Sequence, residues 1–432
     1  ISGQIKKLFI QKAGGKFVDS PQADFSLDQT TENTDAIFFD ADKDGDQDLF
    51  VVTGSNEFAE NAPELHDLLY LNDGKGNLKR DVRFPMIYEN GSSVSAADYD
   101  KDGDIDLFVG TRMVNAKYGQ SAQSNLFIND GTGGFKNQSK RYMPQVTELG
   151  MVTDSEWSDV NGDGYVDLLV TQDWGPVVVF KNERGRKLTK LEPVVGSEGL
   201  WSCIKPADID GDGDMDFVLG NLGLNSKIKA SVEKPAYLHV NDFDKNGSVE
   251  QIISCVTEDG NTYPMVLKGE MQRALPMIKK KFIKYKDYAN KTVEELFSEE
   301  QREGGIVRQI TNTQSSLLIN DGKGNFSLQA LPYQAQFSPI RAIQTGDFNK
   351  DGKLDVLLAG NFFDSLPEWG RFDANYGLLL EGQGKGKFAV KLSKQTGFKT
   401  LGQVRNMALV KGGKSTYVVL AKNDDKAQVF KY

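Results

Sequence analysis

The chain repeats one pattern of apolar and polar positions: an apolar strand, a loop rich in Asp and Gly, and a second apolar strand. The apolar runs, bounded by turn residues, are typical of β-strands. A second element alternates with the first, a strand followed by a turn such as Asn-Asp-Gly, and this pattern predicts hairpins. The first element occurs six times, beginning at Ala36, Ser95, Glu156, Lys205, Leu238 and Gln344.

One Asp loop and one hairpin make about four strands, and four-stranded units in tandem predict a β-propeller. We therefore expect an all-β fold, a single seven-bladed propeller domain spanning residues 1–432. Asp242 and Asp347 are 105 residues apart, about two units, so the Asp242 loop is assigned to the fourth blade and the fifth blade has no such loop. The expected blades are 36–93, 94–150, 151–200, 201–257, 258–330, 340–392 and 404–432, the last closed by residues 1–19.

One segment, 276–303, departs from the β pattern. Ile278 and Phe282 follow helical spacing, and Thr292 with Glu295 has the spacing of a capping box. The pattern predicts two short helices inserted in blade five.

The Asp loops follow the formula DxDxDGxxD, with Asn allowed in place of some Asp. Alternate carboxylates in a tight turn point toward one centre, and such an oxygen cage suits Ca²⁺. The main-chain carbonyl at position seven is expected to add a ligand. The six predicted sets are Asp40, Asp42, Asp44, Asp46 and Asp48; Asp98, Asp100, Asp102, Asp104 and Asp106; Asp159, Asn161, Asp163, Tyr165 and Asp167; Asp208, Asp210, Asp212, Asp214 and Asp216; Asp242, Asp244, Asn246, Ser248 and Glu250; and Asp347, Asn349, Asp351, Lys353 and Asp355.

An EF-hand begins with a similar formula but needs a Glu at position twelve between two helices. Position twelve is aliphatic in all six loops, so the EF-hand is excluded and position nine is expected to close each site. The loops hold 24 of the 61 acidic residues, and six Ca²⁺ would change the formal net charge from −10 to +2. We expect up to six Ca²⁺ with a structural role, because no loop has a nearby His or an obvious open position.

At these loops the sequence resembles the FG-GAP or VCBS repeat, the calcium-loop blade of integrin α-subunit propellers. The segments MVTDSEWSDVNGDGYVDLLVTQDWG from Met151 and GNFFDSLPEWGRFDANYGLLL from Gly360 are similar to secreted VCBS-repeat proteins of Bacteroidetes, grouped with the ASPIC/UnbV and cartilage acidic protein family. This resemblance implies an extracellular, calcium-stabilised propeller with no enzymatic activity carried over. Because the chain begins at Ile1 and such relatives are longer, we expect a module of a larger exported protein.

The expected function is binding at the cell surface, outside the cell or in the periplasm, as an adhesion module that recognises a glycan or protein, or another domain of the parent chain. Aromatic faces stack on sugar rings, and Arg pairs with uronic acid carboxylates. The candidate ligand-binding residues are Trp174, Trp201, Trp369, Arg371 and Tyr376.

Two alternatives stay open: a lyase-like polysaccharide-active enzyme on the same propeller, and a purely structural domain. Catalysis needs a base, and the only histidines are His66, expected on the surface, and His239, expected in a strand core. No nucleophile elbow, phosphate loop or zinc motif is present, so we expect no enzymatic activity and no catalytic residue. The acidic net charge argues against nucleic acid, and no apolar run is long enough to enter a membrane. We expect a monomer.

Overall fold

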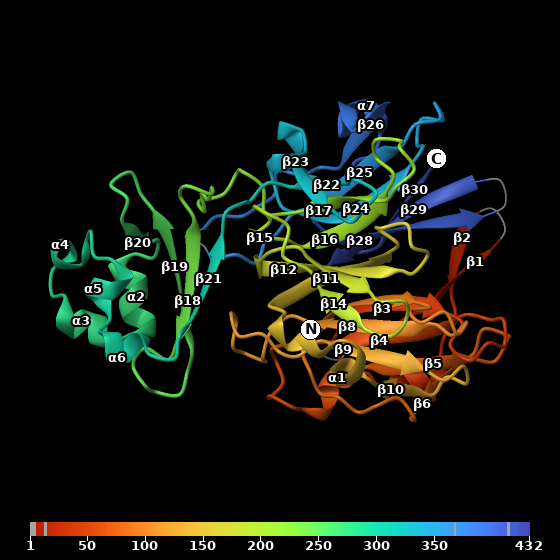
Figure 1. Ribbon diagram of the computed structural model, residues 1–432, viewed down its shortest axis with the longest axis horizontal. Helices are drawn as coiled ribbons and strands as arrows, with labels where there is room; N and C mark the ends of the chain where they lie inside the picture. Colours follow the sequence, from red (N-terminus) through yellow and green to blue (C-terminus); the bar gives the residue numbers. More distant parts are fainter. Residues whose placement is uncertain (1–5, 13–14, 367–368, 413–414) are drawn as a thin grey trace.

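The computed structural model describes residues 6–12, 15–366, 369–412 and 415–432, which form an all-β structure of antiparallel sheets with a few short helices. Six sheets, numbered one to six in chain order, stand in a row, and a further sheet with helices lies beside them (Figure 1). Parts of the expected segments 1–19, 340–392 and 404–432, namely 1–5, 13–14, 367–368 and 413–414, lie outside the described residues. No helix in the described part has the length and apolar character of a membrane span.

The strands of the row follow the repeated pattern. Sheets one to three contain β3 (Asn33–Phe39), β4 (Asp48–Thr53), β5 (Leu68–Asn72) and β6 (Leu78–Asp81); β7 (Gly91–Ala97), β8 (Asp106–Thr111), β9 (Asn125–Asn129) and β10 (Phe135–Asn137); and β11 (Met151–Ser158), β12 (Asp167–Gly175), β13 (Val178–Asn182), β14 (Leu188–Lys190) and β15 (Gly199–Leu200). Sheets four to six contain β16 (Cys203–Ala207), β17 (Asp216–Gly220), β22 (Ser316–Asn320) and β23 (Phe326–Ala330); β24 (Ile340–Gly346), β25 (Asp355–Gly360), β26 (Leu378–Gly384) and β27 (Lys387–Leu392); and β28 (Gln403–Gly412), β29 (Ser415–Asn423) and β30 (Gln428–Lys431).

The sheets pack face to face through apolar side chains. Every residue of the second strands β4, β8, β12, β17 and β25 is buried, as expected for the continuous apolar runs. Between sheets one and two, for example, Phe50 and Leu69 join Leu107 and Phe127 in one cluster. The first strands β3, β7, β11, β16, β24 and β28 pack against each other in that order, so they form the inner side of the row.

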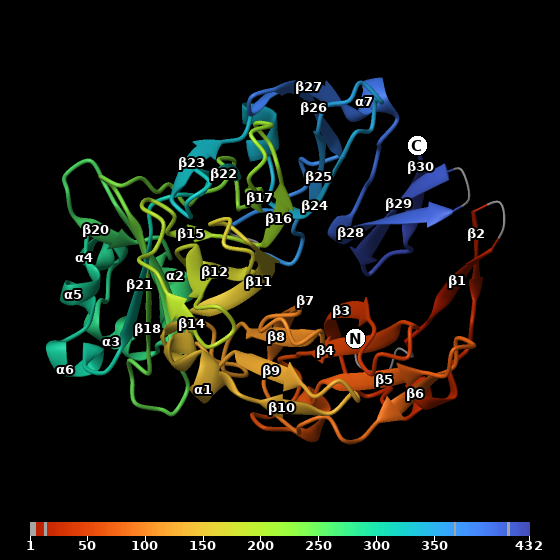
Figure 2. The same cartoon turned by 45° about the vertical axis from the view of Figure 1, so that its right-hand side comes forward.

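The row is not closed into a ring. In the described residues, packing like that between neighbouring first strands does not occur between β28 and β3, the two ends that face each other in Figure 2. The outer face of sheet one is covered by the N-terminal segment instead: Phe25 packs against Tyr70 with ring centroids 5.1 Å apart. Strands β1 (Phe9–Lys12) and β2 (Lys16–Asp19) pair with each other and not with sheet six. The described part of residues 1–19 therefore does not close a seventh blade.

The expected blades 201–257 and 258–330 also differ from the structure. Strand β17 pairs with β22, so β22 and β23 complete sheet four, and the residues between them form an inserted sheet. The inserted sheet has the order β20-β19-β18-β21, and the Asp242 loop joins two of its strands. Its strands are β18 (Ala236–Asn241), β19 (Glu250–Val256), β20 (Thr262–Pro264) and β21 (Ile306–Ile310).

Short helices lie between β20 and β21, covering the inserted sheet. The capping box of Thr292 and Glu295 is confirmed, but the segment 276–303 contains four short helices rather than two, and a fifth precedes it. They are α2 (Lys268–Ala274), α3 (Met277–Lys281), α4 (Tyr285–Tyr288), α5 (Val293–Leu296) and α6 (Glu299–Arg302). Elsewhere the chain has α1 (Ser139–Tyr142), α7 (Ser393–Thr396) and the 3-10 helices η1 (Ala23–Ser26), η2 (Pro63–Leu65), η3 (Pro144–Glu148) and η4 (Tyr333–Gln336).

A repeated asparagine ties the Asp loops of sheets one, two and three to the next sheet. The buried Asn182 side chain donates to the carbonyl of Val166 in its own loop (2.9 Å) and to that of Tyr99 in the preceding loop (2.8 Å). Asn129 and Asn320 make equivalent pairs of bonds. Among the described residues, the Asn72 side chain of sheet one donates only to its own loop, at the carbonyl of Gln47, and makes no inter-sheet bond.

Replacing Asn182 with Ala should therefore cost more than replacing Asn72 with Ala. The first change removes an own-loop bond and an inter-sheet bond and leaves the Tyr99 carbonyl unpaired, so the difference should be about 1–2 kcal/mol in the free energy of unfolding. Urea unfolding of both variants measures this difference. Equal losses would mean that the inter-sheet bond contributes nothing.

Candidate functional site: acidic loops and the central cavity

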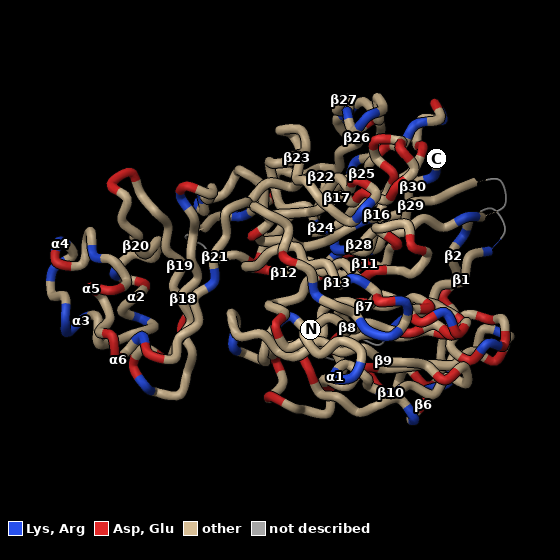
Figure 3. The backbone as a smooth tube through the Cα atoms, viewed as in Figure 1, with Lys and Arg blue, Asp and Glu red and all other residues tan. Residues whose placement is uncertain are grey.

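Each Asp loop joins the first and second strands of a sheet, five in the row and one in the inserted sheet. Acidic residues gather where the loops of the row lie, toward the right of the view in Figure 3. The backbone takes the left-handed conformation at positions four and six, for instance at Lys43 (φ 62°) and Gly45 (φ 92°). Glycine at position six adopts this angle without strain. The tight reversal expected from the formula is thus formed.

Within the loops, the first carboxylate receives a main-chain N–H. Asp40, Asp98 and Asp159 each accept from the glycine five residues later, at 3.1, 3.1 and 2.7 Å. The Asp242 and Asp347 loops share this bond. In the Asp208 loop the carboxylate instead accepts from Gly211, three residues later.

The ninth residue of each loop is the most buried carboxylate. One oxygen of Asp106 accepts the N–H of Tyr99 in the loop (3.3 Å), and the other accepts that of Asn129 in the third strand (2.9 Å). Asp48, Asp167, Asp216 and Asp355 repeat the arrangement. Burial raises the pKa of Asp48 to about 6 and that of Asp106 to about 7. The position predicted to close each site is therefore also the link between the loop and its sheet.

Four loops bring three carboxylates together with one oxygen of each within 4.8 Å of the others. These groups are Asp40, Asp42 and Asp48; Asp98, Asp100 and Asp102; Asp208, Asp210 and Asp216; and Asp242, Asp244 and Glu250. Among the described residues, the buried Oδ1 atoms of Asp40, Asp98 and Asp244 have no hydrogen-bond partner. Clustered, unpaired carboxylate oxygens are the donor set of a hard cation. These clusters can bind a metal ion.

The Asp159 and Asp347 loops have Asn at position three, where the other loops have an acid. Asn161 and Asn349 each accept the N–H of the residue two positions later, at 3.0 and 2.9 Å, as Asp does in the other loops. The loop shape is thus kept with one negative charge fewer. Asp163 and Asp351 lie at position five of these loops.

Position seven has a role that the sequence analysis missed. Its N–H donates to the side chain at position five in all six loops, as Asp46 does to Asp44. Its side chain also contacts the preceding loop: Lys43 pairs with Asp104, and the Lys101 ammonium lies 4.4 Å from the centre of the Tyr165 ring. A lysine at position four of one loop and an Asp or Tyr at position seven of the next loop were the sequence signal for this contact.

A central cavity of about 760 Å³ opens where the row meets the inserted sheet and the loop after β25. The first strands contribute Thr34, Ser92, Thr153 and Arg341 to its lining. Of the predicted ligand-binding residues, Trp174, Trp201 and Trp369 all line this cavity.

These three tryptophans differ in burial. Trp201 is buried and its indole N–H donates to the Ser197 carbonyl, so it mainly supports the wall. Trp174 has a positive φ of 53°, a conformation that bulky residues rarely adopt and that often marks a functional site. Trp369 is half-buried on the loop.

The other two candidates do not line the cavity. The Arg371 guanidinium stacks on the Phe363 ring at 3.6 Å from its centre, and Tyr376 is half-exposed elsewhere on the loop. The charged part of the lining, which the sequence analysis did not select, consists of Arg112, Asp173, Arg341 and Asp364. These residues follow no motif, because they come from three different repeats.

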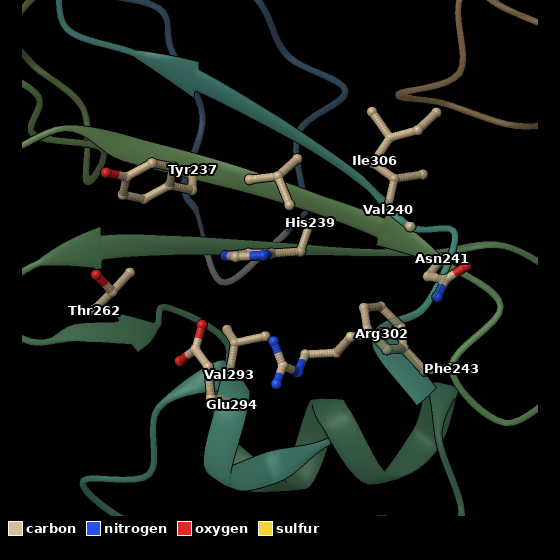
Figure 4. A pocket seen from close by; sticks show the side chains of 12 residues that line it. Tyr237, His239, Val240, Asn241, Phe243, Thr262, Val293, Glu294, Arg302 and Ile306 are labelled. Atoms are coloured by element: carbon tan, nitrogen blue, oxygen red, sulfur yellow. The ribbon is translucent and has the colours of Figure 1, made fainter. Parts of the chain in front are cut away.

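A second cavity, of about 390 Å³, lies between the inserted sheet and its helices (Figure 4). His239, Glu294 and Arg302 surround it, and the His239 Nε2 is 2.8 Å from the Ser254 hydroxyl. Burial lowers the pKa of His239. His239 was expected in a strand core, but it is half-buried and lines this cavity. His66 was expected on the surface, but it is buried, and its pKa is lowered to about 4.

Comparison with known protein families supports the resemblance of the Asp loops to the FG-GAP repeat. Residues 159–219 match the model of the FG-GAP-like repeat family. This FG-GAP segment runs from the third Asp loop through the fourth and ends in β17. No curated protein gave a significant match.

Among solved structures, the chain is similar to the Vibrio cholerae biofilm matrix protein Bap1, with 12% identity, a TM-score of 0.39, and coverage of 99% of this chain and 81% of that one. It is also similar to two structures of BBS1N in complex with ARL6DN, soaked with lead or mercury. These have 9% and 8% identity and a TM-score of 0.35, with coverage of 93% of this chain and 92% of theirs.

Two buried carboxylates connect first strands on the inner side of the row. Asp35 accepts the N–H of Val94 at 3.0 Å, and Asp154 accepts that of Ile204 at 2.9 Å. Burial raises the pKa of Asp35 to about 6 and that of Asp154 to about 8. Asp154 therefore keeps its proton in the native state near neutral pH, whereas the unfolded chain releases it near pH 4.

This shift predicts a pH-dependent stability. Because the native state holds a proton that the unfolded state has lost, the free energy of unfolding should fall as pH rises from about 4 to about 8. Asp154→Asn removes the titration, so its stability relative to wild type should rise by about 3–4 kcal/mol between pH 5 and 8. Urea unfolding across this range gives the slope. A constant difference between the two proteins would contradict the raised pKa.

Proposed function

We propose that the protein is an extracellular, calcium-stabilised binding module that takes up its ligand in the central cavity. The carrying observation is that three tryptophans from separate repeats and loops line one cavity at the inner side of the row. Ligand pockets typically combine a largely apolar lining with a few placed polar groups in about 300–1,000 Å³. The match of residues 159–219 to the FG-GAP-like repeat supports the extracellular, adhesion-type context.

The proposal includes Ca²⁺ in up to six loops, the grouping with secreted VCBS-repeat proteins, and a role within a larger exported protein. The carboxylates of loop positions one, three, five and nine would hold the ion. The ion would then offset the repulsion between the clustered carboxylates. A closed seven-bladed ring would need a further sheet between β28 and β3.

Calcium should stabilise the protein, because an ion that binds only the native state raises its stability by about 2.7 kcal/mol per site at a hundredfold excess over Kd. Removing Ca²⁺ with a chelator should lower the melting temperature by many degrees, and adding Ca²⁺ should restore it. Asp98→Asn should lower the bound Ca²⁺ by one ion per chain, measured by calorimetric titration and metal analysis.

Asp130→Asn is the matched control, since Asp130 lies in the hairpin turn after β9, outside the Asp loops. An unchanged melting temperature with metal verifiably removed would contradict a stabilising role. The same stoichiometry in wild type and Asp98→Asn would contradict the ligand assignment in that loop.

Binding in the central cavity is tested by Trp369→Ala, because Trp369 lines the cavity but is only half-buried. A glycan array and an array of extracellular proteins should identify a ligand for the wild type. The variant should bind this ligand at least tenfold more weakly with little change in melting temperature. Tyr333→Ala removes an exposed aromatic residue outside the cavity and serves as control. Equal binding by both variants would place the site elsewhere.

The second cavity favours one alternative, a polysaccharide-active enzyme. His239 faces the same space as Glu294 and Arg302, and a half-buried imidazole with a lowered pKa is available as a base. Formation of unsaturated sugar products from an acidic polysaccharide, lost in His239→Gln, would establish this activity.

A further inference from the structure

Arg341 is a half-buried cation that makes no ion pair among the described residues. It lies in β24, the first strand of sheet five, and lines the central cavity. Its Nε atom is buried and has no hydrogen-bond partner among the described residues, and no ion pair of its guanidinium is found there. The guanidinium carbon lies 5.1 Å from the centre of the Phe362 ring. An unpaired buried charge is costly to folding, so its presence calls for a compensating group.

The neighbouring charges do not supply that group. Asp173 is already bound by the Arg112 guanidinium at 2.5 Å and by the Tyr118 hydroxyl at 2.8 Å. Arg405 lies on the same Phe362 ring as Arg341, at 5.9 Å from its centre. Burial, Arg405 and Arg112 lower the pKa of Arg341 to about 10, so the guanidinium is still charged at neutral pH.

Among the described residues, the charges that line the cavity sum to zero, and Arg405 on the Phe362 ring adds one positive charge. Arg112, Arg341 and Arg405 are accompanied by Asp173 and Asp364, which accepts a hydrogen bond from Gln403 beside Arg405. One added negative charge would balance these five residues. A singly charged carboxylate fits this requirement better than a doubly charged phosphate. The planar guanidinium also matches a carboxylate with two parallel hydrogen bonds.

The rest of the lining suits a sugar ring. Trp369 offers an aromatic face to the cavity, and the buried Trp174 packs in the same apolar cluster. The hydroxyls of Ser92 and Ser202 already donate to main-chain carbonyls, so their free lone pairs can accept from sugar hydroxyls. An acidic peptide would use the arginine equally but would not need this aromatic face.

We propose that Arg341 binds the carboxylate of a uronic acid residue, so that the ligand of the central cavity is an acidic glycan. This inference rests on the proposed binding function and adds the ligand class and the residue that selects it. The cavity excludes neutral analogues, since a neutral sugar leaves Arg341 buried and unpaired.

The test uses short oligomers of galacturonic and mannuronic acid, each with its methyl ester as the uncharged analogue of the same ring. Calorimetric titration of the Ca²⁺-loaded wild type should show binding of at least one acid form and at least tenfold weaker binding of its ester. Arg341→Gln should lose this preference, and Arg341→Lys should keep part of it as a point charge. Arg186→Gln, on an exposed hairpin turn, should behave as wild type.

Melting temperatures separate recognition from folding. Arg341→Gln removes an unpaired buried charge, so its melting temperature without ligand should equal or exceed that of wild type. A large decrease would show that Arg341 supports the fold and would overturn the proposal. Equal binding of acid and ester, unchanged acid binding by Arg341→Gln, absence of binding to every uronate, or binding of polyglutamate in their place would also overturn it.

Failure of this inference is distinct from failure of the proposed function. A neutral glycan or a protein whose binding depends on Trp369 but not on Arg341 would keep the cavity as the binding site while rejecting the acidic ligand. Uronate binding that is unaffected by both substitutions would reject the cavity itself.

Discussion

The structure depends on a buried carboxylate at the end of each Asp loop. The ninth residue, Asp48 in the first loop and Asp106 in the second, accepts one N–H from the loop and another from the third strand of its sheet. The loop therefore cannot change shape without disturbing the sheet. Burial is the main cause of the raised pKa of this carboxylate, and the nearby loop acids raise the pKa further, so its charge is costly without a cation. Metal binding and sheet packing are thus coupled through one side chain.

Local features of this design were predictable from sequence, since they depend on residues near each other in the chain. The Asp loops, their turn at position six and the capping box of Thr292 belong to this class. The pairing of β17 with β22 was not predictable from the sequence. Strand β18 follows β17 with an equally suitable strand pattern, and only packing between distant segments selects β22 over β18 as the partner. The open row has a similar origin: Phe25 covers the face of sheet one, and nothing in its local pattern indicates that contact.

The candidate site shows the same division. Tryptophans could be selected because their size makes them conspicuous, and the fold brings Trp174, Trp201 and Trp369 to one cavity. Arg371 was selected because arginine pairs with uronic acid carboxylates, yet it stacks on Phe363 outside the lining. Arg341 was missed because it occupies an ordinary polar position in a strand, and its unpaired state emerges only when all neighbours are known.

The polar residues of the first strands differ in what they bind. Asp35 and Asp154 cross to the next first strand and accept its N–H, so their polar atoms support the row. Ser202 donates to the carbonyl of Ile340 in the same way. Arg341, the next residue, has no such bond among the described residues. The Arg341 guanidinium packs on the Phe362 ring, 5.1 Å from its centre, but its charge is not compensated by an ion pair among the described residues. The proposed acidic ligand would supply that compensation.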